Sequence, residues 1–399
     1  MSEFSSKLQG LSIYWVSSDR FDTKPDKSTW TEIGDSLSLQ GARVSIVACY
    51  AKEPYFPEGK AVDMVYLKTL DLPLIYRISF TLSAFFWLLR NAARDDLIIL
   101  NPHELWMLPL LKLARFRRLH LDVRTLPIAG RSMKDGIDIF LFWKTVMSLF
   151  GKSFSSYSFI TQRLLETVEK EFKVRYEDHV IWQSGVNVDF FVEASKQVQP
   201  PASGKPFTVF YHGSLYKRRG VDRVVEAFAQ LPARVLENSR LVIVGSGSGL
   251  ELLRQQITGL GLESKVELRG FVPYEEIPQQ IAGADVCICP LPDYPEWNVS
   301  SPLKVLEYMA CGKPLILTPI PAHQDVLDGE AFVVWAKGDK AGDFVPAIVE
   351  AYDRQVELQE AALAAPALVR QDWDWSAHGA KFGDYLARHY IGDLPGNAR

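Results

Sequence analysis

Residues 298–317 read NVSSPLKVLEYMACGKPLIL, and this stretch predicts a helix followed by a strand. Val305, Leu306 and Met309 recur at helical spacing and can face inward together. Pro302 suits a first helical turn, where its missing N–H has no intrahelical partner to lose. Gly312 is a typical helix stop, and residues 314–318 resemble a buried strand. The stretch therefore predicts one helix–strand unit of an α/β fold.

The polar residues of this predicted helix indicate a ligand. A helix N-terminus attracts anions because its free N–H groups and the positive end of its dipole point the same way. Glu307 lies one to two turns further in, where its carboxylate can accept hydrogen bonds from ligand hydroxyl groups. A nucleoside diphosphate, with its ribose, has this geometry. The simpler alternative is an ordinary helix–strand unit on which Glu307 is solvated.

Residues 301–314, SPLKVLEYMACGKP, resemble the donor-site signature of the retaining family 4 glycosyltransferases, which have the GT-B fold. In that family the motif lies in the C-terminal domain and its glutamate holds the nucleotide ribose. The family pattern has a second glutamate, which contacts the donor sugar, and here Val299 occupies its position. The resemblance therefore implies a nucleotide-sugar site in which Glu307 binds ribose and sugar recognition differs from the usual pattern.

Length and composition agree with a two-domain cytosolic protein. A chain of 399 residues is too long for one ordinary core, and 47% apolar with 23% charged residues is typical of soluble globular proteins. A net charge of −4 does not favour a nucleic-acid partner. The four cysteines lie in apolar contexts without a histidine cluster, which favours buried thiols over a metal site. We expect cytoplasmic localisation, since neither a signal-peptide pattern nor a run of membrane-spanning length is found.

Strand-like and helix-like segments alternate in both halves, which predicts parallel sheets covered by helices. With the resemblance, this predicts two Rossmann-like, doubly wound domains facing a central cleft. A polar, proline-containing stretch indicates the linker. The expected segments are an acceptor-side domain at 1–193, a linker at 194–206, a nucleotide-sugar domain at 207–372, and a final segment at 373–399 whose helix packs back on the first domain.

The carboxyl ends of the predicted strands of the first half carry the candidates for acceptor binding and catalysis, because ligands bind at that edge of a parallel sheet. The acceptor-side candidates are Ser17, Asp19 and Arg20, and the catalytic candidates are His103, Asp122, Arg124 and, from the second half, Arg219. Glu104 lies at the same predicted edge. Where the family often has a histidine, this chain has Arg124 or Asp122 as the best replacement.

Three adjacent cations in the second half can clamp a diphosphate and stabilise the charge of a leaving group. Lys217, Arg218 and Arg219 follow a predicted strand and precede a predicted helix. Arg219-Gly220 resembles the Lys-Gly of the family, but Ser214 stands where the family has an arginine. Which of the three cations contacts phosphate stays open, and a solvated basic turn is the alternative.

Glycines complete the predicted donor site. Residues 245–249, GSGSG, only partly match a dinucleotide fingerprint, because Leu250 occupies the third glycine position. The resemblance places this loop near the diphosphate and residues 269–272 over the nucleobase. The donor-binding residues that it implies are Gly213, Ser214, Lys217, Arg218, Arg219, Gly245, Gly247, Gly270, Phe271, Val272, Ser300, Ser301, Pro302, Leu303, Lys304 and Glu307.

The resemblance implies a retaining enzyme that moves a sugar from a UDP- or GDP-sugar to a glycan or lipid-linked glycan, in bacterial surface polysaccharide synthesis (capsule, exopolysaccharide or lipopolysaccharide). We expect it to need neither a prosthetic group nor a metal. A nucleotide-sugar epimerase or phosphorylase of the same fold is one alternative. A non-catalytic nucleotide-binding scaffold is another, given Val299.

Three predicted helices of the first half, at 74–93, 105–113 and 137–150, are rich in Phe, Trp and Leu. Basic residues lie beside them: Lys112, Arg115, Arg117 and Arg118. Apolar helices flanked by cations are typical of proteins that bind the surface of a membrane. We therefore expect a patch that binds the inner face of the cell membrane, with ordinary core helices as the alternative.

Overall fold

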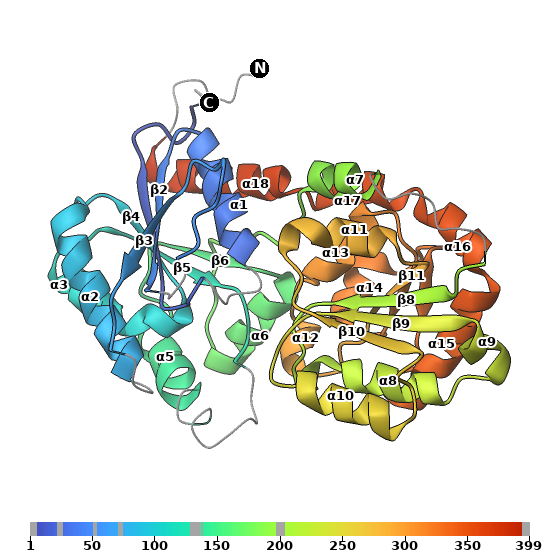
Figure 1. Cartoon of the computed structure of the whole chain (residues 1–399). Helices are drawn as coiled ribbons and strands as arrows, with labels where there is room; N and C mark the ends of the chain where they lie inside the picture. Colours follow the sequence, from blue (N-terminus) through green and yellow to red (C-terminus); the bar gives the residue numbers. More distant parts are fainter. Residues whose placement is uncertain are drawn as a thin grey trace. The chain divides into compact units, whose positions relative to one another are not determined.

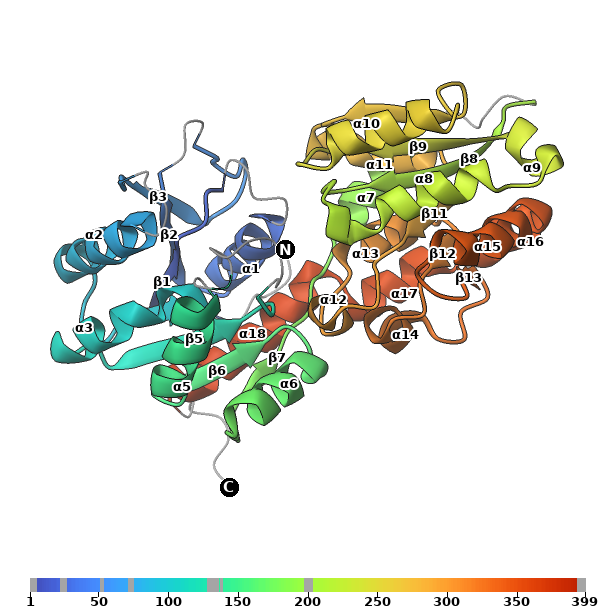
Figure 2. The same ribbon diagram turned by 90° about the horizontal axis from the view of Figure 1, so that it is seen from below.

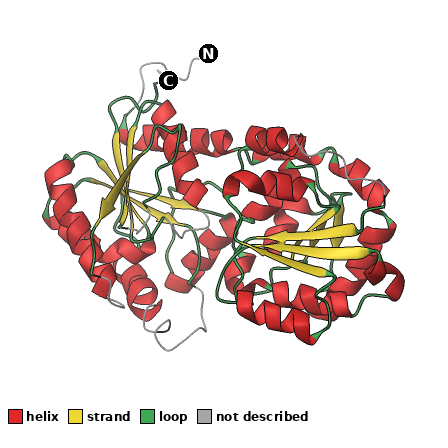
Figure 3. Cartoon of the chain, in the orientation of Figure 1, coloured by secondary structure: helices red, strands yellow, loops and turns green. Residues whose placement is uncertain are grey.

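The computed structural model describes residues 6–21, 27–50, 54–70, 75–127, 136, 139–196 and 204–392. The chain divides into two compact units, Met1–Ser184 with Trp375–Arg399, and Gly185–Asp374. In each unit the described strands form one parallel sheet, and helices cover both of its faces (Figure 3). The predicted α/β class with two Rossmann-like domains is confirmed.

The sheet of the first unit has the order β3-β2-β1-β4-β5-β6-β7 in the part that the structure describes. Its strands are β1 (Ser12–Ser17), β2 (Arg43–Cys49), β3 (Asp63–Leu67), β4 (Leu97–Leu100), β5 (Arg118–Val123), β6 (Ser156–Phe159) and β7 (Val180–Ile181). The central strands consist mostly of apolar residues because helices cover both faces of the sheet. The chain changes direction across the sheet between β1 and β4, and ligands bind outside the carboxyl ends of strands at such a reversal.

Helices pack on the two faces of this sheet in separate groups (Figures 1 and 2). Helix α18 packs along α1 on one face, whereas α2, α3 and α5 gather around η1 on the other. The helical elements of this unit include α1 (Lys27–Leu39), α2 (Ile75–Asn91), the 3-10 helix η1 (Pro102–Met107), α3 (Leu108–Leu113), the π-helix η2 (Phe140–Thr145), α5 (Val146–Phe150), α6 (Gln162–Phe172) and α18 (Trp375–Tyr390).

The helix predicted over residues 105–116 is interrupted in the structure. Pro109 has no N–H to donate to the preceding turn, so the α-helix α3 starts only at Leu108 and a 3-10 helix precedes it. This break places Glu104 in the tighter turn directly after β4.

A chain of buried hydrogen bonds ties α18 to the first sheet. Tyr390 Oη lies 2.5 Å from Ser156 Oγ, and Ser156 Oγ lies 2.6 Å from His120 Nδ1. His120 Nε2 lies 2.8 Å from Ser158 Oγ, which donates to Asp122 Oδ1 at 2.6 Å. Burial lowers the pKa of His120 to about 3 and raises the pKa of Asp122 to about 6. Asp122 shares a face of β5 with His120 and is fully buried, and its catalytic role stays a prediction.

The sheet of the second unit has the order β10-β9-β8-β11-β12-β13 over the described residues. Its strands are β8 (Phe207–His212), β9 (Ser239–Val244), β10 (Val266–Gly270), β11 (Val286–Cys289), β12 (Leu315–Leu317) and β13 (Val333–Trp335). The direction reverses between β8 and β11. By the same rule as in the first unit, the carboxyl ends of these two strands mark the expected ligand site.

Helices also cover both faces of the second sheet (Figures 1 and 2). Helix α8 packs against α10 and α15 on one face, and α13 packs against α7 and α17 on the other. The helical elements include α7 (Val188–Lys196), η3 (Lys217–Arg219), α8 (Val221–Ala229), α9 (Ala233–Glu237), α10 (Leu250–Gly259), η4 (Tyr274–Glu276), α11 (Ile277–Ala282), α12 (Pro295–Asn298), α13 (Leu303–Ala310), α14 (Pro321–Leu327), α15 (Ala341–Asp353), α16 (Gln355–Ala362) and α17 (Ala365–Asp372).

The boundary between the units differs from the predicted one. The second unit begins at Gly185, before the predicted end of the first domain at 193. Asn187 caps α7 by accepting a hydrogen bond from the Phe190 N–H at 3.0 Å, and Phe191 is buried where α7 packs on α11 and α13. Helix α7 therefore covers the start of the predicted linker, and residues 197–203 of that linker lie outside the described residues.

Candidate functional site

The sheet reversal in the second unit brings a histidine and a glutamate together. His212 ends β8, and its backbone N–H donates to the Tyr308 hydroxyl of α13 at 3.0 Å. On the same helix, Glu307 Oε2 lies 3.1 Å from His212 Nε2, and both side chains are buried. Glu307 thus lies at the edge of the sheet where a ligand is expected, beside His212.

Lys304 lies one helical turn before Glu307 and points toward the loop after β8. Its Nζ is 5.4 Å from the centre of the Tyr211 ring, and a Cβ on Gly213 would meet its Cε at 3.0 Å. Burial lowers the pKa of Lys304, and the nearby charge of Arg219 lowers it further, while Cys289 and Glu307 act in the opposite direction. The ammonium group is thus held beside a second cation in a poorly solvated place.

Arg219 supplies this second cation. Its Cζ lies 4.2 Å from the centre of the Trp297 ring, which fixes the guanidinium group by a cation–π contact. In the described part of the chain, neither Arg219 nor Lys304 forms an ion pair with a carboxylate. Two neighbouring cations without an ion-pair partner repel each other, and a bound anion lowers that repulsion. The pair is therefore suited to a phosphate or diphosphate group.

The structure separates the three adjacent cations of the sequence. Arg218 Nε donates to the buried Glu296 Oε1 at 2.9 Å, and its Cζ lies 4.2 Å from the centre of the Tyr294 ring. Its carbonyl oxygen accepts the indole N–H of Trp297 at 2.9 Å. Arg218 therefore anchors the loop of residues 290–298 and is not available to phosphate, contrary to its predicted donor-binding role. Lys217 is exposed and points to a separate pocket.

The turn before α13 uses its own polar groups. The Ser300 N–H and hydroxyl both donate to the Trp297 carbonyl, at 3.1 and 2.8 Å. The Leu303 N–H donates to the Ser301 carbonyl at 3.0 Å, and Pro302 has no N–H. The Ser300 and Leu303 N–H groups are therefore already paired within the turn, and the anion site at the backbone of Ser301 to Leu303 stays a prediction.

The glycine-rich loop packs backbone against backbone. A Cβ on Gly245 would lie 1.9 Å from the Gly213 carbonyl oxygen, and one on Gly247 would lie 2.6 Å from that of Leu215. The Gly245 N–H donates to the Gly270 carbonyl at 2.7 Å, which joins this loop to the end of β10. Phe271, directly after β10, is 76% exposed. Close packing of loops therefore explains these glycines without a dinucleotide fingerprint.

In the first unit, the reversal between β1 and β4 gathers predicted acceptor-side residues. The Ser17 hydroxyl donates to Asp19 Oδ2 at 3.0 Å, and the Ser18 N–H donates to Glu104 Oε1 at 2.7 Å. Burial raises the pKa of the Glu104 carboxyl to about 7. His103, a predicted catalytic residue, precedes Glu104 in η1. These strand ends therefore present carboxyl and hydroxyl groups at one edge of the sheet.

Arg124 lies just beyond β5, at the same edge of the sheet. Its Nη1 donates to the Trp182 carbonyl at 2.8 Å, and its Cζ is 3.4 Å from the centre of the Trp182 ring. Arg20 is likewise half-buried after β1. The predicted ligand contacts of these two residues stay predictions.

Two residues of the site were not predicted from the sequence. His212 has a usable signal, since it ends a strand and precedes the glycine at which the loop turns. No feature of the sequence marks Trp297 as a site residue, because the short helix α12 that carries it matches no recognisable motif. Its contact with Arg219 depends on packing between segments far apart in sequence.

Among the described residues, no group of three or more His, Cys, Asp or Glu side chains is arranged to hold a metal ion. None of the described helices combines the length and the hydropathy that crossing a membrane requires.

Comparison with known proteins identifies the second unit. Residues 206–354 match the family described as glycosyl transferases group 1. The chain is 31% identical over 180 residues to a GDP-mannose-dependent alpha-(1-6)-phosphatidylinositol monomannoside mannosyltransferase of Mycolicibacterium smegmatis, a match that covers 43% of this chain and 46% of that protein. The chain thus matches less than half the length of such curated relatives.

Solved structures resemble both units. Sucrose-phosphate synthase from Thermosynechococcus elongatus superposes with a TM-score of 0.79 at 16% identity, covering 96% of this chain and 99% of that one. Anabaena HepE in complex with UDP and glucose gives 0.73 at 16% identity, covering 94% and 99%. At this identity the likeness shows the fold alone. The chain therefore has the GT-B fold, and its residues 206–354 match the glycosyl transferases group 1 family.

Proposed function

We propose that the protein is a retaining family 4 glycosyltransferase that transfers a sugar from a nucleoside diphosphate sugar to a hydroxyl group of a glycan or lipid-linked glycan. The observation that carries the proposal is the pair Lys304 and Arg219, two close cations without a carboxylate partner in the described residues. Glu307 and His212 lie beside Lys304, where the ribose of a nucleotide is expected.

The two cations hold the diphosphate and stabilise the charge that it gains when it leaves. Glu307, which lies beside His212, accepts hydrogen bonds from the ribose hydroxyl groups. In the reaction, the bond between sugar and phosphate breaks and the acceptor oxygen bonds to the anomeric carbon. The acceptor proton passes to an oxygen of the leaving phosphate, so no strong protein base is needed. The side-chain cations supply the positive charge, and we propose that no metal is required.

The donor is a UDP- or GDP-sugar. The Anabaena structure contains UDP and glucose, and the mycobacterial relative is named for GDP-mannose, so both bases occur among similar proteins. We assign the base to the backbone of Gly270, Phe271 and Val272, since Gly270 ends β10 beside the glycine loop. Both assignments rest on the resemblance in the donor motif together with these contacts.

The acceptor binds at the carboxyl edge of the first sheet. Ser17, Asp19 and Arg20 follow β1, and Glu104 lies beside them after β4. Carboxylate and hydroxyl groups suit the hydroxyl groups of a sugar. The name of the mycobacterial relative gives a glycolipid acceptor, which supports a glycan or lipid-linked glycan here and a place in surface polysaccharide synthesis. His103 and Arg124 are the remaining catalytic candidates.

A surface of the first unit suits a lipid-linked acceptor. Ile75, Ile78, Leu82 and Phe86 lie along one face of α2 and are each between 45% and 55% exposed. Exposed apolar side chains continue over the neighbouring α3, η2 and α5: Leu113, Phe140 and Leu149. Figure 1 shows α2, α3 and α5 gathered on one side of the sheet. We name these seven side chains the apolar patch.

Exposed cations surround the apolar patch, among them Arg90, Lys112, Arg115, Lys144 and Lys152. Anionic headgroups attract such cations, while the apolar side chains enter the acyl boundary. Two signals of this kind together give stable peripheral binding. We therefore propose that an anionic membrane surface covers the apolar patch.

The cation pair predicts the behaviour of two single variants. Arg219→Ala and Lys304→Ala should each weaken UDP or GDP binding about 10- to 100-fold, because each loses charge-assisted contacts worth about 1.5–3 kcal/mol. Isothermal titration calorimetry measures the affinity. Arg254→Ala, an exposed arginine on α10, is the matched control and should bind as the wild type does. If Arg219→Ala and Lys304→Ala bind UDP and GDP as tightly as Arg254→Ala does, the two cations do not belong to the nucleotide site.

Glu307 predicts a loss of discrimination against a modified ribose. Wild-type protein should bind the 2′,3′-dideoxy form of the nucleotide about tenfold or more weakly than the natural form. In Glu307→Gln this difference should largely disappear, because the charged acceptor of the hydroxyl groups is gone. Isothermal titration of the natural and the dideoxy nucleotide into wild-type and Glu307→Gln protein measures the affinities that this comparison needs. An unchanged difference in the variant contradicts the ribose role.

Retention predicts the stereochemistry of the product. With UDP-glucose or GDP-mannose as donor and octyl glycosides as acceptors, the new linkage should have the α configuration of the donor. The anomeric signal in the proton NMR spectrum reports it directly. A β product would show inversion and would remove the family 4 assignment.

The apolar patch predicts salt-sensitive membrane binding. The protein should float with phosphatidylglycerol vesicles in a density gradient at low salt, and less so with phosphatidylcholine vesicles or at high salt. The double substitution Leu82→Gln with Phe86→Gln should abolish flotation. Leu363→Gln, an exposed leucine of the second unit, is the control. If the wild type fails to float with anionic vesicles at low salt, the membrane proposal is wrong.

A further inference from the structure

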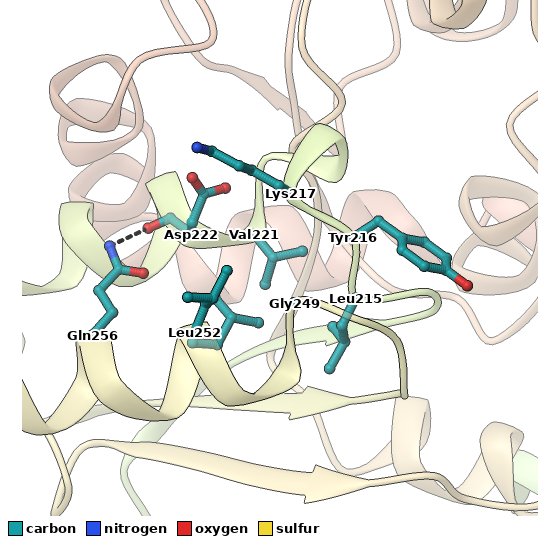
Figure 4. Close-up of a pocket in the computed structure, with 9 residues that line it drawn as sticks. Leu215, Tyr216, Lys217, Val221, Asp222, Gly249, Leu252 and Gln256 are labelled. Atoms are coloured by element: carbon teal, nitrogen blue, oxygen red, sulfur yellow. Dashed lines mark hydrogen bonds between the residues drawn. The ribbon is translucent and has the colours of Figure 1, made fainter. Parts of the chain in front are cut away.

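The second unit contains a pocket that the proposed donor site does not use. It has a volume of about 210 Å³ and lies between α8 and α10, below the loop after β8 (Figure 4). Leu215, Val221 and Leu253 form a buried apolar floor, and Leu252 adds a side chain that is 59% exposed. Pockets for drug-sized ligands have a volume of about 300 Å³ or more. This pocket is smaller, so it suits a ligand the size of a single ring.

Three polar side chains line the same pocket. Gln256 reaches across from α10 and donates through Nε2 to the Asp222 carbonyl oxygen at 3.0 Å (Figure 4), which leaves its amide oxygen as an acceptor. Asp222 adds a carboxylate without a hydrogen-bond partner in the described residues; protein atoms enclose its Oδ1, so Oδ2 is the oxygen that a ligand can reach. Lys217 adds an ammonium group with three donors. The pocket thus offers two kinds of acceptor and one donor above an apolar floor.

This combination selects among ligand classes. An anion is disfavoured by the Asp222 carboxylate, and a purely apolar ligand would leave the Gln256 amide oxygen without a donor. A pyranose ring matches the acceptors, the donor and the apolar floor of the pocket. Its hydroxyl groups both donate and accept hydrogen bonds, and its C–H faces are apolar. We propose that this pocket binds one pyranose unit of a glycan, in a subsite separate from the diphosphate site.

The two sites share one loop but use different residues. Arg219 faces Trp297 at the diphosphate site, whereas Lys217, two residues earlier, lines the pocket. The Gly249 N–H donates to the Leu215 carbonyl at 2.7 Å, which closes the loop between them. The subsite gives a role to Lys217, the cation among the three that neither pairs with Glu296 nor is assigned to the diphosphate.

A single ring in a small, open pocket binds weakly, but a weak subsite raises the effective concentration of a long glycan at the protein. This consequence rests on the proposed function, since it takes the glycan to be the acceptor. The binding of a pyranose itself does not depend on transferase activity and can be measured alone.

Saturation-transfer NMR on the full chain tests the proposal with methyl α-glycosides of glucose, mannose and galactose at millimolar concentrations. At least one glycoside should receive saturation from the protein. Gln256→Ala and Leu252→Ser should each weaken its binding about fivefold or more, because they remove an acceptor and part of the apolar floor. Gln255→Ala and Leu260→Ser, exposed positions of the same segment outside the pocket, are matched controls and should bind as the wild type does.

Two outcomes would overturn the subsite: no glycoside binds, or binding persists unchanged in Gln256→Ala and Leu252→Ser. Titration with UDP and GDP on the same samples separates this result from the proposed function. Glycoside binding without nucleotide binding would keep the subsite and remove the donor site, and the reverse would remove only the subsite.

Discussion

The donor half depends on one close contact between two backbones. The loop after β9 touches the loop after β8 so tightly that a Cβ on Gly245 would lie 1.9 Å from the Gly213 carbonyl oxygen. Side chains cannot fit between such loops, so glycine is required on one of them. This contact fixes the loop that carries Lys217, Arg218 and Arg219. One part of the loop then faces the diphosphate site, and another lines the pocket between α8 and α10.

The cations around this loop differ in whether they have a carboxylate partner. Arg218 has a buried carboxylate partner in Glu296 and therefore stabilises the local structure. Arg219 and Lys304 lack such a partner in the described residues, and burial with mutual repulsion lowers the pKa of Lys304. Keeping two cations close together costs folding free energy, which binding of the proposed diphosphate would return. Strain of this kind is typical of binding sites.

The first unit shows the opposite use of polar residues. The chain of hydrogen bonds from Tyr390 through His120 to Asp122 Oδ1 is buried, and it secures α18. Polar groups at the strand ends, such as Glu104, instead lie at the ligand edge. Sequence position alone could not separate these roles. Asp122 and Arg124 are two residues apart, but only the latter extends beyond its strand.

Local patterns determined the α/β alternation, the helix that Gly312 ends, and the spacing that puts Lys304 and Glu307 on adjacent turns of α13. These features depend on neighbours within one or two turns, so the sequence by itself contains them. Tertiary structure alone decided which of the three adjacent cations pairs with a carboxylate, because Glu296 lies 78 residues from Arg218. It also assigned α7 to the second unit through the packing of Phe191. Contacts between such distant segments leave no local pattern, since only the folded chain brings them together.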